Sequence, residues 1–325
     1  MANEGPLRII QGPGTMSPLS VDQAVIEQQF KSHGALLLRG FEFGVEEFRQ
    51  FAERLCTTSV ANESPNRVQL DRQSSIQSVD LGEEPFPLHP ELSREPWRPD
   101  ACLFACLGAP SHGGETTVCD GVELVRQLPA DLVNIMRQRR LFYFQLASPE
   151  VLEFWLGTAT PTAAQLASPP NQCPYFFLED GDRVIRGFSR PMLQRPMFSD
   201  QPAFANFLLF ARDFQGVDNF PVLESGEPVP DGWMTAVRNA ATEITYAHAW
   251  RVGDILILDN SRFMHGRRAI TDPKGRTIAS YFGYVGFAPP NEFEPAIVPW
   301  RQGQFRPPLP QRLKDLTAGT SRSDK

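Results

Sequence analysis

The chain has 325 residues, of which 41% are hydrophobic and 21% charged, a composition typical of globular proteins. Its formal net charge of −7 argues against a sequence-independent nucleic-acid surface, because such a surface needs clustered Lys and Arg to displace counterions. The longest apolar run, residues 101–109, is far shorter than the roughly 18 residues of a membrane span. The N-terminus has neither the basic flank nor the apolar core of a signal peptide, so we predict a soluble, cytoplasmic protein. The cysteines form no Cys-x-x-Cys pair, and neither a disulfide framework nor a structural zinc site is expected.

The first part of the chain predicts a small helical lobe around one buried strand. Residues 21–31 have apolar side chains at helical spacing, and Ser20 is the expected N-cap. GALLLRGF, residues 34–41, indicates a short buried strand, and residues 44–56 again have a helical period. This order of elements favours a helical N-terminal lobe packed against a larger body.

The rest of the chain is rich in short, apolar segments bounded by turn residues, which indicates a mainly β architecture. Strands are predicted at residues 101–108, 115–120, 141–146, 175–188 (a hairpin turning at Asp180-Gly181), 244–260 (two strands) and 277–287. Helices are predicted at residues 128–140 and 201–214. Residues 156–172 are small, polar and broken by proline, which predicts a lid-like loop insertion. We expect one domain over residues 1–310 and a disordered tail over residues 311–325.

A histidine and a glutamate stand two residues apart in EPFPLHPELSREPW, residues 84–97. In an extended segment, residues i and i+2 point to the same side, so His89 and Glu91 can aim at one point. Pro87 and Pro90 favour extended backbone around them. One such pair is common by chance, so its meaning depends on partners elsewhere in the chain.

His265 is the candidate partner, because it follows the predicted strand GDILILDN. A β-barrel that brought His265 to the same mouth as His89 and Glu91 would complete the facial triad of a non-haem Fe(II) oxygenase. Such a triad leaves three coordination positions for a cosubstrate and O2. The remaining histidines are expected to be structural. Of these, His248 is the strongest alternative candidate for a residue that faces the site.

Fe(II) with adjacent open positions suits a 2-oxo acid such as 2-oxoglutarate. The distal carboxylate of 2-oxoglutarate then needs a fixed cation and a hydroxyl group. Arg276, on the next predicted strand after His265, can pair with a carboxylate through two parallel hydrogen bonds. Thr116 follows a Gly-Gly turn in HGGETTVCD and can supply the hydroxyl.

The ordered set GALLLRGF, LHPE, GGET, GDILILDN, HGR and a late GR resembles the TauD/TfdA family of Fe(II)/2-oxoglutarate dioxygenases, including its clavaminate-synthase-like branch. The resemblance covers about residues 20–290. It implies a mainly β fold with flanking helices, built on a double-stranded β-helix (a jelly-roll, cupin-like core). It also implies that His89, Glu91 and His265 bind Fe(II) and that Arg276 and Thr116 bind 2-oxoglutarate. Glu91 stands where much of the family has Asp, and a carboxylate at this position argues against halogenation.

The resemblance further implies an oxygenase that uses O2 to hydroxylate an unactivated C–H bond of a small molecule, with release of succinate and CO2. Arginines near the expected pocket suggest an anionic substrate, such as an amino acid or an amino-acid derivative of secondary metabolism. Asn260 is expected to shape a strand end, and Arg262 is a further candidate for a substrate carboxylate. The candidate substrate contacts are Gln77, Ser78, Asp80, Arg186, Arg190 and Arg268.

Several alternatives stay open at this point. Desaturation or cyclisation would use the same residues as hydroxylation. A zinc hydrolase with a His2Glu site is an alternative of another class, but the chain lacks His-Glu-x-x-His spacing and Arg276 would have no role in it. A non-catalytic binding module is a third reading. The sequence also leaves open whether the substrate is tethered to a carrier protein and whether the chain forms a homo-oligomer.

Overall fold

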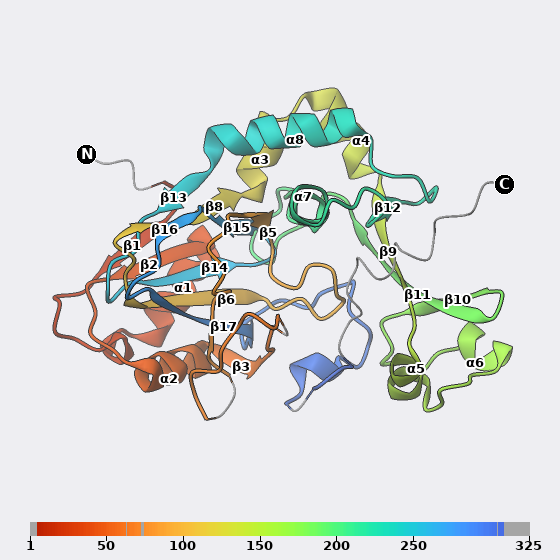
Figure 1. The fold of residues 1–325 in the computed structure, drawn as a ribbon, viewed down its shortest axis with the longest axis horizontal. Coiled ribbons are helices and arrows are strands. Elements are labelled where there is room, and N and C mark those ends of the chain that lie inside the picture. The colour runs from red at the N-terminus through yellow and green to blue at the C-terminus, as the bar shows by residue number, and fades with distance from the viewer. Residues whose placement is uncertain (1–4, 63, 73–74, 304, 309–325) are drawn as a thin grey trace.

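A computed structural model describes residues 5–62, 64–72, 75–303 and 305–308, and two facing β-sheets form its body (Figure 1). The strands of the larger sheet are β1 (Arg8–Gln11), β2 (Ala35–Arg39), β3 (Cys56–Ser59), β4 (Gln77–Ser78), β6 (Ala101–Gly108), β14 (Ile255–Asp259) and β17 (Thr277–Val285). Their order is β1-β2-β14-β6-β17-β3, and β4 pairs with β17. The strands of the smaller sheet are β5 (Phe86–His89), β8 (Thr116–Asp120), β13 (Tyr246–His248) and β15 (Phe263–Arg267), in the order β13-β8-β15-β5.

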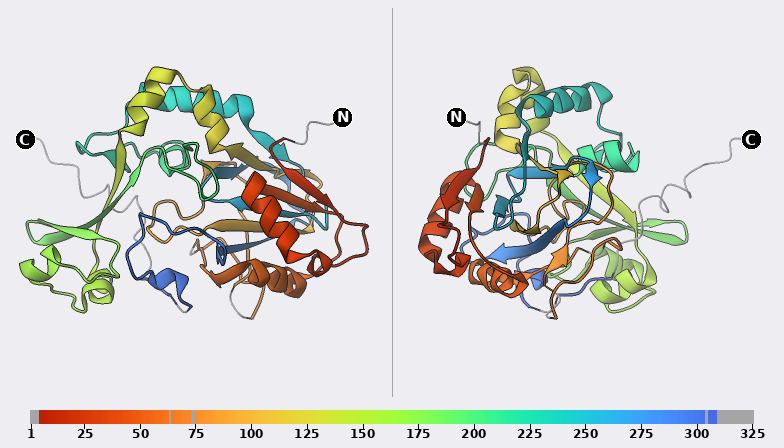
Figure 2. Two further views of the ribbon diagram at one scale, coloured as in Figure 1. Left: turned by 180° about the vertical axis from the view of Figure 1, so that it is seen from behind. Right: turned by 60° about the vertical axis from the view of Figure 1, so that its left-hand side comes forward.

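The larger sheet is buried on both faces, and its side chains alternate between two cores. In β14, Ile255 and Ile257 belong to the cluster shared with the N-terminal helices, whereas Leu256 and Leu258 face the interior between the two sheets. A strand buried on both faces needs a continuous apolar run, and the segment ILILD supplies one. The helices α1 (Gln23–His33) and α2 (Val45–Leu55) cover the outer face of the sheet (Figure 2).

Local capping sets the start of α1, and here the sequence prediction is corrected. The side chain of Asp22 accepts a hydrogen bond from the amide of Ala24 at 2.9 Å, so Asp22 is the N-cap. Ser20 ends the short 3-10 turn η1 (Pro18–Ser20) instead. The helix ends at His33, and the capping residue Gly34 has a φ of 74°, the left-handed conformation common at helix C-termini.

A second group of elements packs beside the two sheets. Its strands are β9 (Arg140–Leu146), β10 (Phe176–Asp180), β11 (Arg183–Pro191) and β12 (Val222–Leu223), in the order β10-β11-β9-β12. Its helices are α3 (Gly121–Gln127), α4 (Ala130–Arg137), α5 (Pro149–Leu156), α6 (Ala163–Ala167), α7 (Leu208–Phe210) and α8 (Asp231–Ile244). The remaining short elements are β7 (His112–Gly113), which pairs with β16 (Ile270–Asp272), and the 3-10 turn η3 (Pro299–Arg301). Figure 1 shows α5, α6 and the tip of the β10–β11 hairpin projecting from the body.

Two predicted segments differ from the structure. Residues 156–172 include α6, which the capping box of Thr162 and Gln165 starts, so the segment is partly helical. The single helix predicted over residues 201–214 is reduced to α7 and the following π-helical turn η2 (Ala211–Gln215). The reason is local: the backbone of Ala203 exchanges hydrogen bonds with Gln194 instead of entering a helix.

The predicted tail over residues 311–325 lies outside the described residues. Within the described ranges, no helix combines the length and hydropathy that crossing a bilayer requires.

Candidate active site

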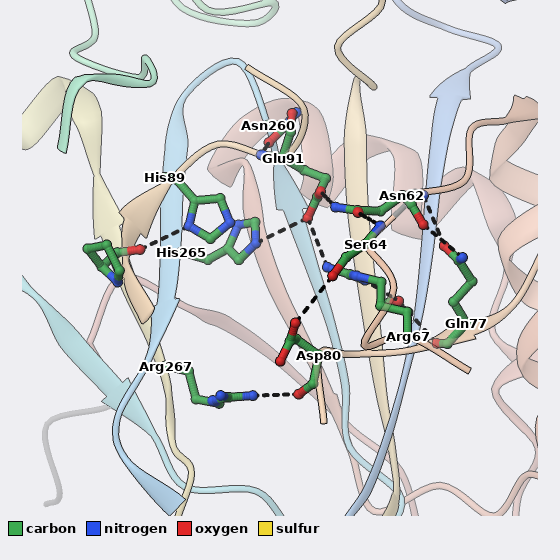
Figure 3. A network of polar contacts seen from close by, with 12 residues as sticks. Asn62, Ser64, Arg67, Gln77, Asp80, His89, Glu91, Asn260, His265 and Arg267 are labelled. Atoms are coloured by element: carbon green, nitrogen blue, oxygen red, sulfur yellow. Dashed lines mark hydrogen bonds and ion pairs between the residues drawn. The ribbon is translucent and has the colours of Figure 1, made fainter. Parts of the chain in front are cut away.

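Three side chains with metal-binding atoms meet at the mouth of the smaller sheet (Figure 3). His89 is the last residue of β5, Glu91 lies in the turn that follows, and His265 is at the centre of β15. The antiparallel register of β5 and β15 sets His265 opposite His89, with ring centroids 4.7 Å apart. One ligand atom from each of the three residues lies within 4.8 Å of the other two. The structure therefore brings together the three predicted metal ligands.

His89 is oriented by its own strand. Its Nδ1 lies 2.9 Å from the carbonyl oxygen of Pro87, and with Nδ1 donating in this hydrogen bond Nε2 is left as the free ligand atom. Burial, together with the nearby His265, lowers the pKa of His89 to about 4. The ring is therefore neutral at neutral pH and offers a lone pair.

Glu91 is held at both its backbone and its carboxylate. Its amide donates to Oδ1 of Asn260 at 2.7 Å, and Nδ2 of Asn260 donates back to the Glu91 carbonyl at 3.0 Å. Nδ2 of Asn62 donates to Oε1 of Glu91, and a guanidinium nitrogen of Arg67 lies 3.6 Å from Oε2. Burial alone would raise the pKa of Glu91, but Arg67 and the two histidines outweigh burial and hold the pKa at about 2. The carboxylate is therefore ionised.

This donor set fits Fe(II). Oε2 of Glu91 is buried and accepts no hydrogen bond from the described residues, so a lone pair faces the point where the ligand atoms converge. Two neutral imidazoles and one carboxylate on one side of a site are the ligands of the facial triad that non-haem Fe(II) oxygenases use. The hydrogen bonds to Pro87, Asn62 and Asn260 fix the orientation of the ligands, as partners of metal ligands do in other proteins.

The triad opens into a cavity of about 710 Å³ that Thr116 and Arg276 also line. Thr116 is the first residue of β8, and its hydroxyl oxygen accepts a hydrogen bond from Nε1 of Trp250 at 3.0 Å. Because the hydroxyl accepts in that bond, its own hydrogen is free to donate to a ligand in the cavity. The geometry suits the hydroxyl role predicted for Thr116.

Arg276 precedes β17 and is partly buried. Its Nε is buried, and none of the described residues accepts a hydrogen bond from it. Burial, with Arg267 nearby, lowers the pKa of Arg276 to about 10, so the guanidinium stays charged at neutral pH. Gly114 makes room for it, since a Cβ on Gly114 would lie 3.1 Å from Nε. A buried cation with no anionic neighbour of its own in the described structure favours an anionic ligand.

Comparison with known proteins settles the family. The family described as "Taurine catabolism dioxygenase TauD, TfdA family" matches residues 8–280. The chain belongs to the TauD/TfdA family. Members of this family are Fe(II)/2-oxoglutarate-dependent dioxygenases, and the chain is accordingly an enzyme of this class with Fe(II), 2-oxoglutarate and O2 as cofactor and cosubstrates. The TauD/TfdA assignment confirms the predicted resemblance and favours the dioxygenase over the zinc hydrolase and the binding module.

Individual relatives are distant. "Dapdiamide synthesis protein DdaC" of Enterobacter agglomerans is 23% identical over 300 residues, which cover 80% of this chain and 88% of DdaC. Among solved structures, PvcB from Pseudomonas aeruginosa aligns with a TM-score of 0.56 and 16% identity over 88% of each chain. A taurine dioxygenase from Burkholderia xenovorans aligns with a TM-score of 0.55 and 13% identity over 85% of each chain. These structural similarities to TauD/TfdA proteins confirm the predicted jelly-roll fold.

Among the predicted substrate contacts of this TauD/TfdA chain, Asp80 lines the cavity. Gln77 and Ser78 lie behind it and hold the loop between β3 and β4. The Gln77 side chain bonds both backbone groups of Asn62, at 2.9 Å each, and the Ser78 hydroxyl accepts from the amide of Val68 at 2.9 Å. Their effect on the site is therefore indirect.

The predicted arginine contacts are not at the cavity, and here the sequence prediction is corrected. Arg186 and Arg190 lie in β11 and bond within the protein, Arg186 to Tyr175 and Gln145 and Arg190 to the carbonyl of Pro96. Arg268 is exposed.

Other predicted residues also lie off the cavity. Arg262 pairs with Asp120 through two hydrogen bonds, at 3.0 and 2.6 Å, and His248 is buried with Nε2 3.2 Å from Asp254. No described residue in the range 156–172 lines the cavity, and a lid function for this segment stays a prediction.

Sequence reasoning missed Asn62, Arg67 and Arg267, all of which line the cavity. Arg267 could have been found, because it stands two residues after His265 in β15 and so points to the same face, whereas Arg268 points to the other. Asn62 and Arg67 have no local signal, since they reach the triad only through the path of the loop before β4 (Figure 3). The aromatic lining of Phe207, Phe210 and Phe214 was also missed, because these residues were assigned to a regular helix.

Proposed function

We propose that the chain hydroxylates an unactivated C–H bond of a small molecule that is an amino acid or an amino-acid derivative. 2-Oxoglutarate and O2 are consumed, and succinate and CO2 are released. The observation that carries the proposal is that one cavity contains both the His89–Glu91–His265 cluster and Arg276, a cation with no anionic neighbour of its own among the described residues. A zinc hydrolase would need only the cluster.

The names of relatives support a biosynthetic role. DdaC is named as a dapdiamide synthesis protein, and PvcB is described as an Fe, alpha-ketoglutarate dependent oxygenase from an isonitrile synthetic pathway. We therefore propose that the product is an intermediate in the synthesis of a small natural product. A substrate tethered to a carrier protein is an alternative within this proposal, and the cytoplasmic location stays a prediction.

The triad residues would hold the iron on one face of its coordination sphere. His89 and His265 would bind through neutral imidazole nitrogens and Glu91 through Oε2, the carboxylate oxygen that accepts no hydrogen bond from the described residues. When bound, the iron supplies the activation of O2, with one oxygen atom ending in the alcohol and the other in succinate. The bonds from Asn62, Asn260 and Pro87 keep the ligand atoms aimed at the metal throughout.

Arg276 and Thr116 would bind the distal carboxylate of 2-oxoglutarate. The guanidinium can donate two parallel hydrogen bonds, and the Thr116 hydroxyl can add a third because Trp250 already occupies one of its lone pairs. The pairing would also neutralise a buried cation, which is costly to leave alone. These contacts would fix one end of the cosubstrate and leave its keto acid end free to bind the metal.

The apolar side of the cavity would exclude water from the reacting C–H bond. Phe104 packs edge-on against the ring of His265 with centroids 5.0 Å apart, and Phe210 lies 4.7 Å from the ring of His89. Desaturation and cyclisation remain alternatives that would use the same residues, because the outcome depends on which atom of the substrate lies nearest the metal.

Two measurements test this proposal. Anaerobic protein with Fe(II) and 2-oxoglutarate should show a weak visible charge-transfer band, which Zn(II) in place of Fe(II) cannot give. Succinate formation should then be stimulated by at least one compound in a screen of amino acids, their derivatives and their carrier-bound forms. A missing band would contradict the site assignment. A band with no stimulation by any of these compounds would contradict the substrate class and leave the metal site standing.

A further inference from the structure

Arg67 occupies a position in the cavity that the proposed chemistry does not use. It lies on the loop between β3 and β4, and its side chain is only 9% exposed. Nη1 donates to the hydroxyl of Ser280 at 3.1 Å, the guanidinium lies 5.1 Å from the centroid of the Phe282 ring, and Nη2 is 3.6 Å from Oε2 of Glu91. Nε is buried and bonds none of the described residues. Figure 3 shows the side chain reaching Glu91 from the side opposite the two histidines.

With Fe(II) and 2-oxoglutarate bound, the charges in the cavity would leave Arg67 without a full counter-ion. Fe(II), Arg67 and Arg276 would carry four positive charges, whereas Glu91 and the two carboxylates of 2-oxoglutarate would carry three negative ones. Glu91 is the carboxylate that Arg67 contacts, and binding to the metal would draw its charge away. The other charged lining residues have partners or face solvent. Arg267 donates to the backbone carbonyls of Asp80 and Glu84, and the nearby Asp80 carboxylate offsets its charge. Arg94 lies 3.8 Å from Glu95, and Glu84 is exposed. A buried guanidinium always stays charged, so one further anion would stabilise Arg67.

The opposite side of the triad is apolar. Phe86, Phe210 and Phe214 stack on one another, with centroids 4.7 Å apart for Phe86 and Phe214 and 4.9 Å for Phe210 and Phe214. The π-helical turn η2 presents Phe214 at the rim, where it is 46% exposed, and such turns are frequent at functional sites. A ligand that reaches from Arg67 to this aromatic wall must pass the metal ligands.

We propose that Arg67 binds the carboxylate of the primary substrate and that the wall of Phe86, Phe210 and Phe214 binds its apolar part. This inference rests on the proposed oxygenase function and narrows its substrate class to carboxylates with an apolar side chain. Such a ligand supplies the missing negative charge and fills the surface that the wall offers. It also places the carbon atoms between its two ends beside the triad.

The experiment compares acids with their primary amides on the anaerobic protein with Fe(II) and 2-oxoglutarate. The probes are N-acetyl-L-phenylalanine, N-acetyl-L-leucine and 3-phenylpropionate, each with the matching amide, and the readout is Kd from calorimetry and from the change in the charge-transfer band. At least one acid should bind the wild type about tenfold or more tightly than its amide. Arg67→Gln should remove that preference while changing amide affinity less than about twofold, and Arg67→Lys should fall between them.

Three controls separate the roles that Arg67 could have. Asn62→Ala disturbs Glu91 from the same loop, so it should weaken the band without removing the preference for acids. Arg268→Gln removes an exposed arginine outside the cavity and should leave every affinity unchanged. The Kd of 2-oxoglutarate should change less than about threefold in Arg67→Gln, because its distal carboxylate is assigned to Arg276.

Outcomes other than those expected above count against the proposal. If no acid binds the wild type more tightly than its amide, Arg67 does not bind a substrate carboxylate. A larger loss of 2-oxoglutarate affinity than of probe affinity in Arg67→Gln would assign Arg67 to the cosubstrate. Matching profiles for Arg67→Gln and Asn62→Ala would reduce Arg67 to a residue that positions Glu91. A wild type without the charge-transfer band would overturn the proposed function and this inference together, whereas a normal band with no effect of Arg67→Gln would overturn this inference alone.

Discussion

Arg276 in the cavity and Arg186 in the β9–β11 sheet differ in what their guanidinium groups contact. Arg186 donates to Tyr175 at 2.7 Å and to Gln145 at 2.6 Å, and it lies 4.0 Å from Glu95. Arg276, in contrast, gives no side-chain hydrogen bond to the described residues and stands beside a cavity. A buried arginine whose guanidinium bonds side chains away from any cavity is structural, whereas unbonded guanidinium donors beside a cavity indicate a ligand site.

The largest effect is expected at the triad. His265→Ala should abolish the charge-transfer band and succinate formation, because the remaining His89 and Glu91 cannot hold Fe(II) on one face. The measurement is the absorption difference on adding 2-oxoglutarate anaerobically. His112→Ala removes an exposed histidine of β7 and should leave the band intact. A band that persists in His265→Ala would show that the ligand assignment is wrong.

Arg186→Met should chiefly lower stability. Removing the guanidinium leaves Oε1 of the buried Gln145 without its donor and takes a positive charge away from Glu95, which keeps its hydrogen bond from Tyr175. The expected cost is about 1–3 kcal/mol in the free energy of unfolding. Urea denaturation measures this loss. Arg183→Met, on the same strand but exposed, should change the free energy by less than about 0.5 kcal/mol. An altered Kd for 2-oxoglutarate in the folded Arg186→Met protein would contradict the assignment of a purely structural role to Arg186.

Arg276→Gln, unlike Arg186→Met, should weaken 2-oxoglutarate binding and leave stability unchanged. Loss of a charge-assisted pair to a carboxylate should raise the Kd of 2-oxoglutarate by about a hundredfold, or about 2.7 kcal/mol, while the protein keeps its stability. A titration of the charge-transfer band gives this Kd directly. An unchanged Kd would remove Arg276 from the cosubstrate role, and a large loss of stability would place it with Arg186 among the structural arginines.

The smallest effect is expected at Gly114, and it tests whether the guanidinium of Arg276 lies against this residue. Gly114→Ala adds a methyl group 3.1 Å from Nε of Arg276, at a φ of 71° that alanine rarely adopts. We expect a loss of about 1 kcal/mol in stability and a several-fold rise in the Kd of 2-oxoglutarate. Gly181→Ala is the matched control, because Gly181 has a φ of 64° and open space around its Cβ. It should share the loss of stability and leave the Kd unchanged; equal Kd values for the two variants would argue against contact between residue 114 and the guanidinium.

Several parts of the site could be predicted because they follow from local periodicity. His89 ends β5 and Glu91 lies in the turn directly after it, so their spacing in the sequence keeps both beside one point. The alternation of side chains along β15 would have selected Arg267, which lines the cavity, instead of the exposed Arg268. Prediction of the helix over residues 201–214 was wrong because the backbone pairing of Ala203 with Gln194 overrides helical preference.

The ligand types, their order along the chain and the family of the protein can be recognised in the amino-acid sequence. Which arginines face the cavity, and which bond other groups inside the protein, depends on the folded chain. Arg67 illustrates the reason, since it meets Glu91 through a loop whose path depends on hydrogen bonds to Gln77 and to Ser280, which is distant along the chain. Contacts between distant segments depend on the packing of the whole chain, and no short stretch of sequence encodes them.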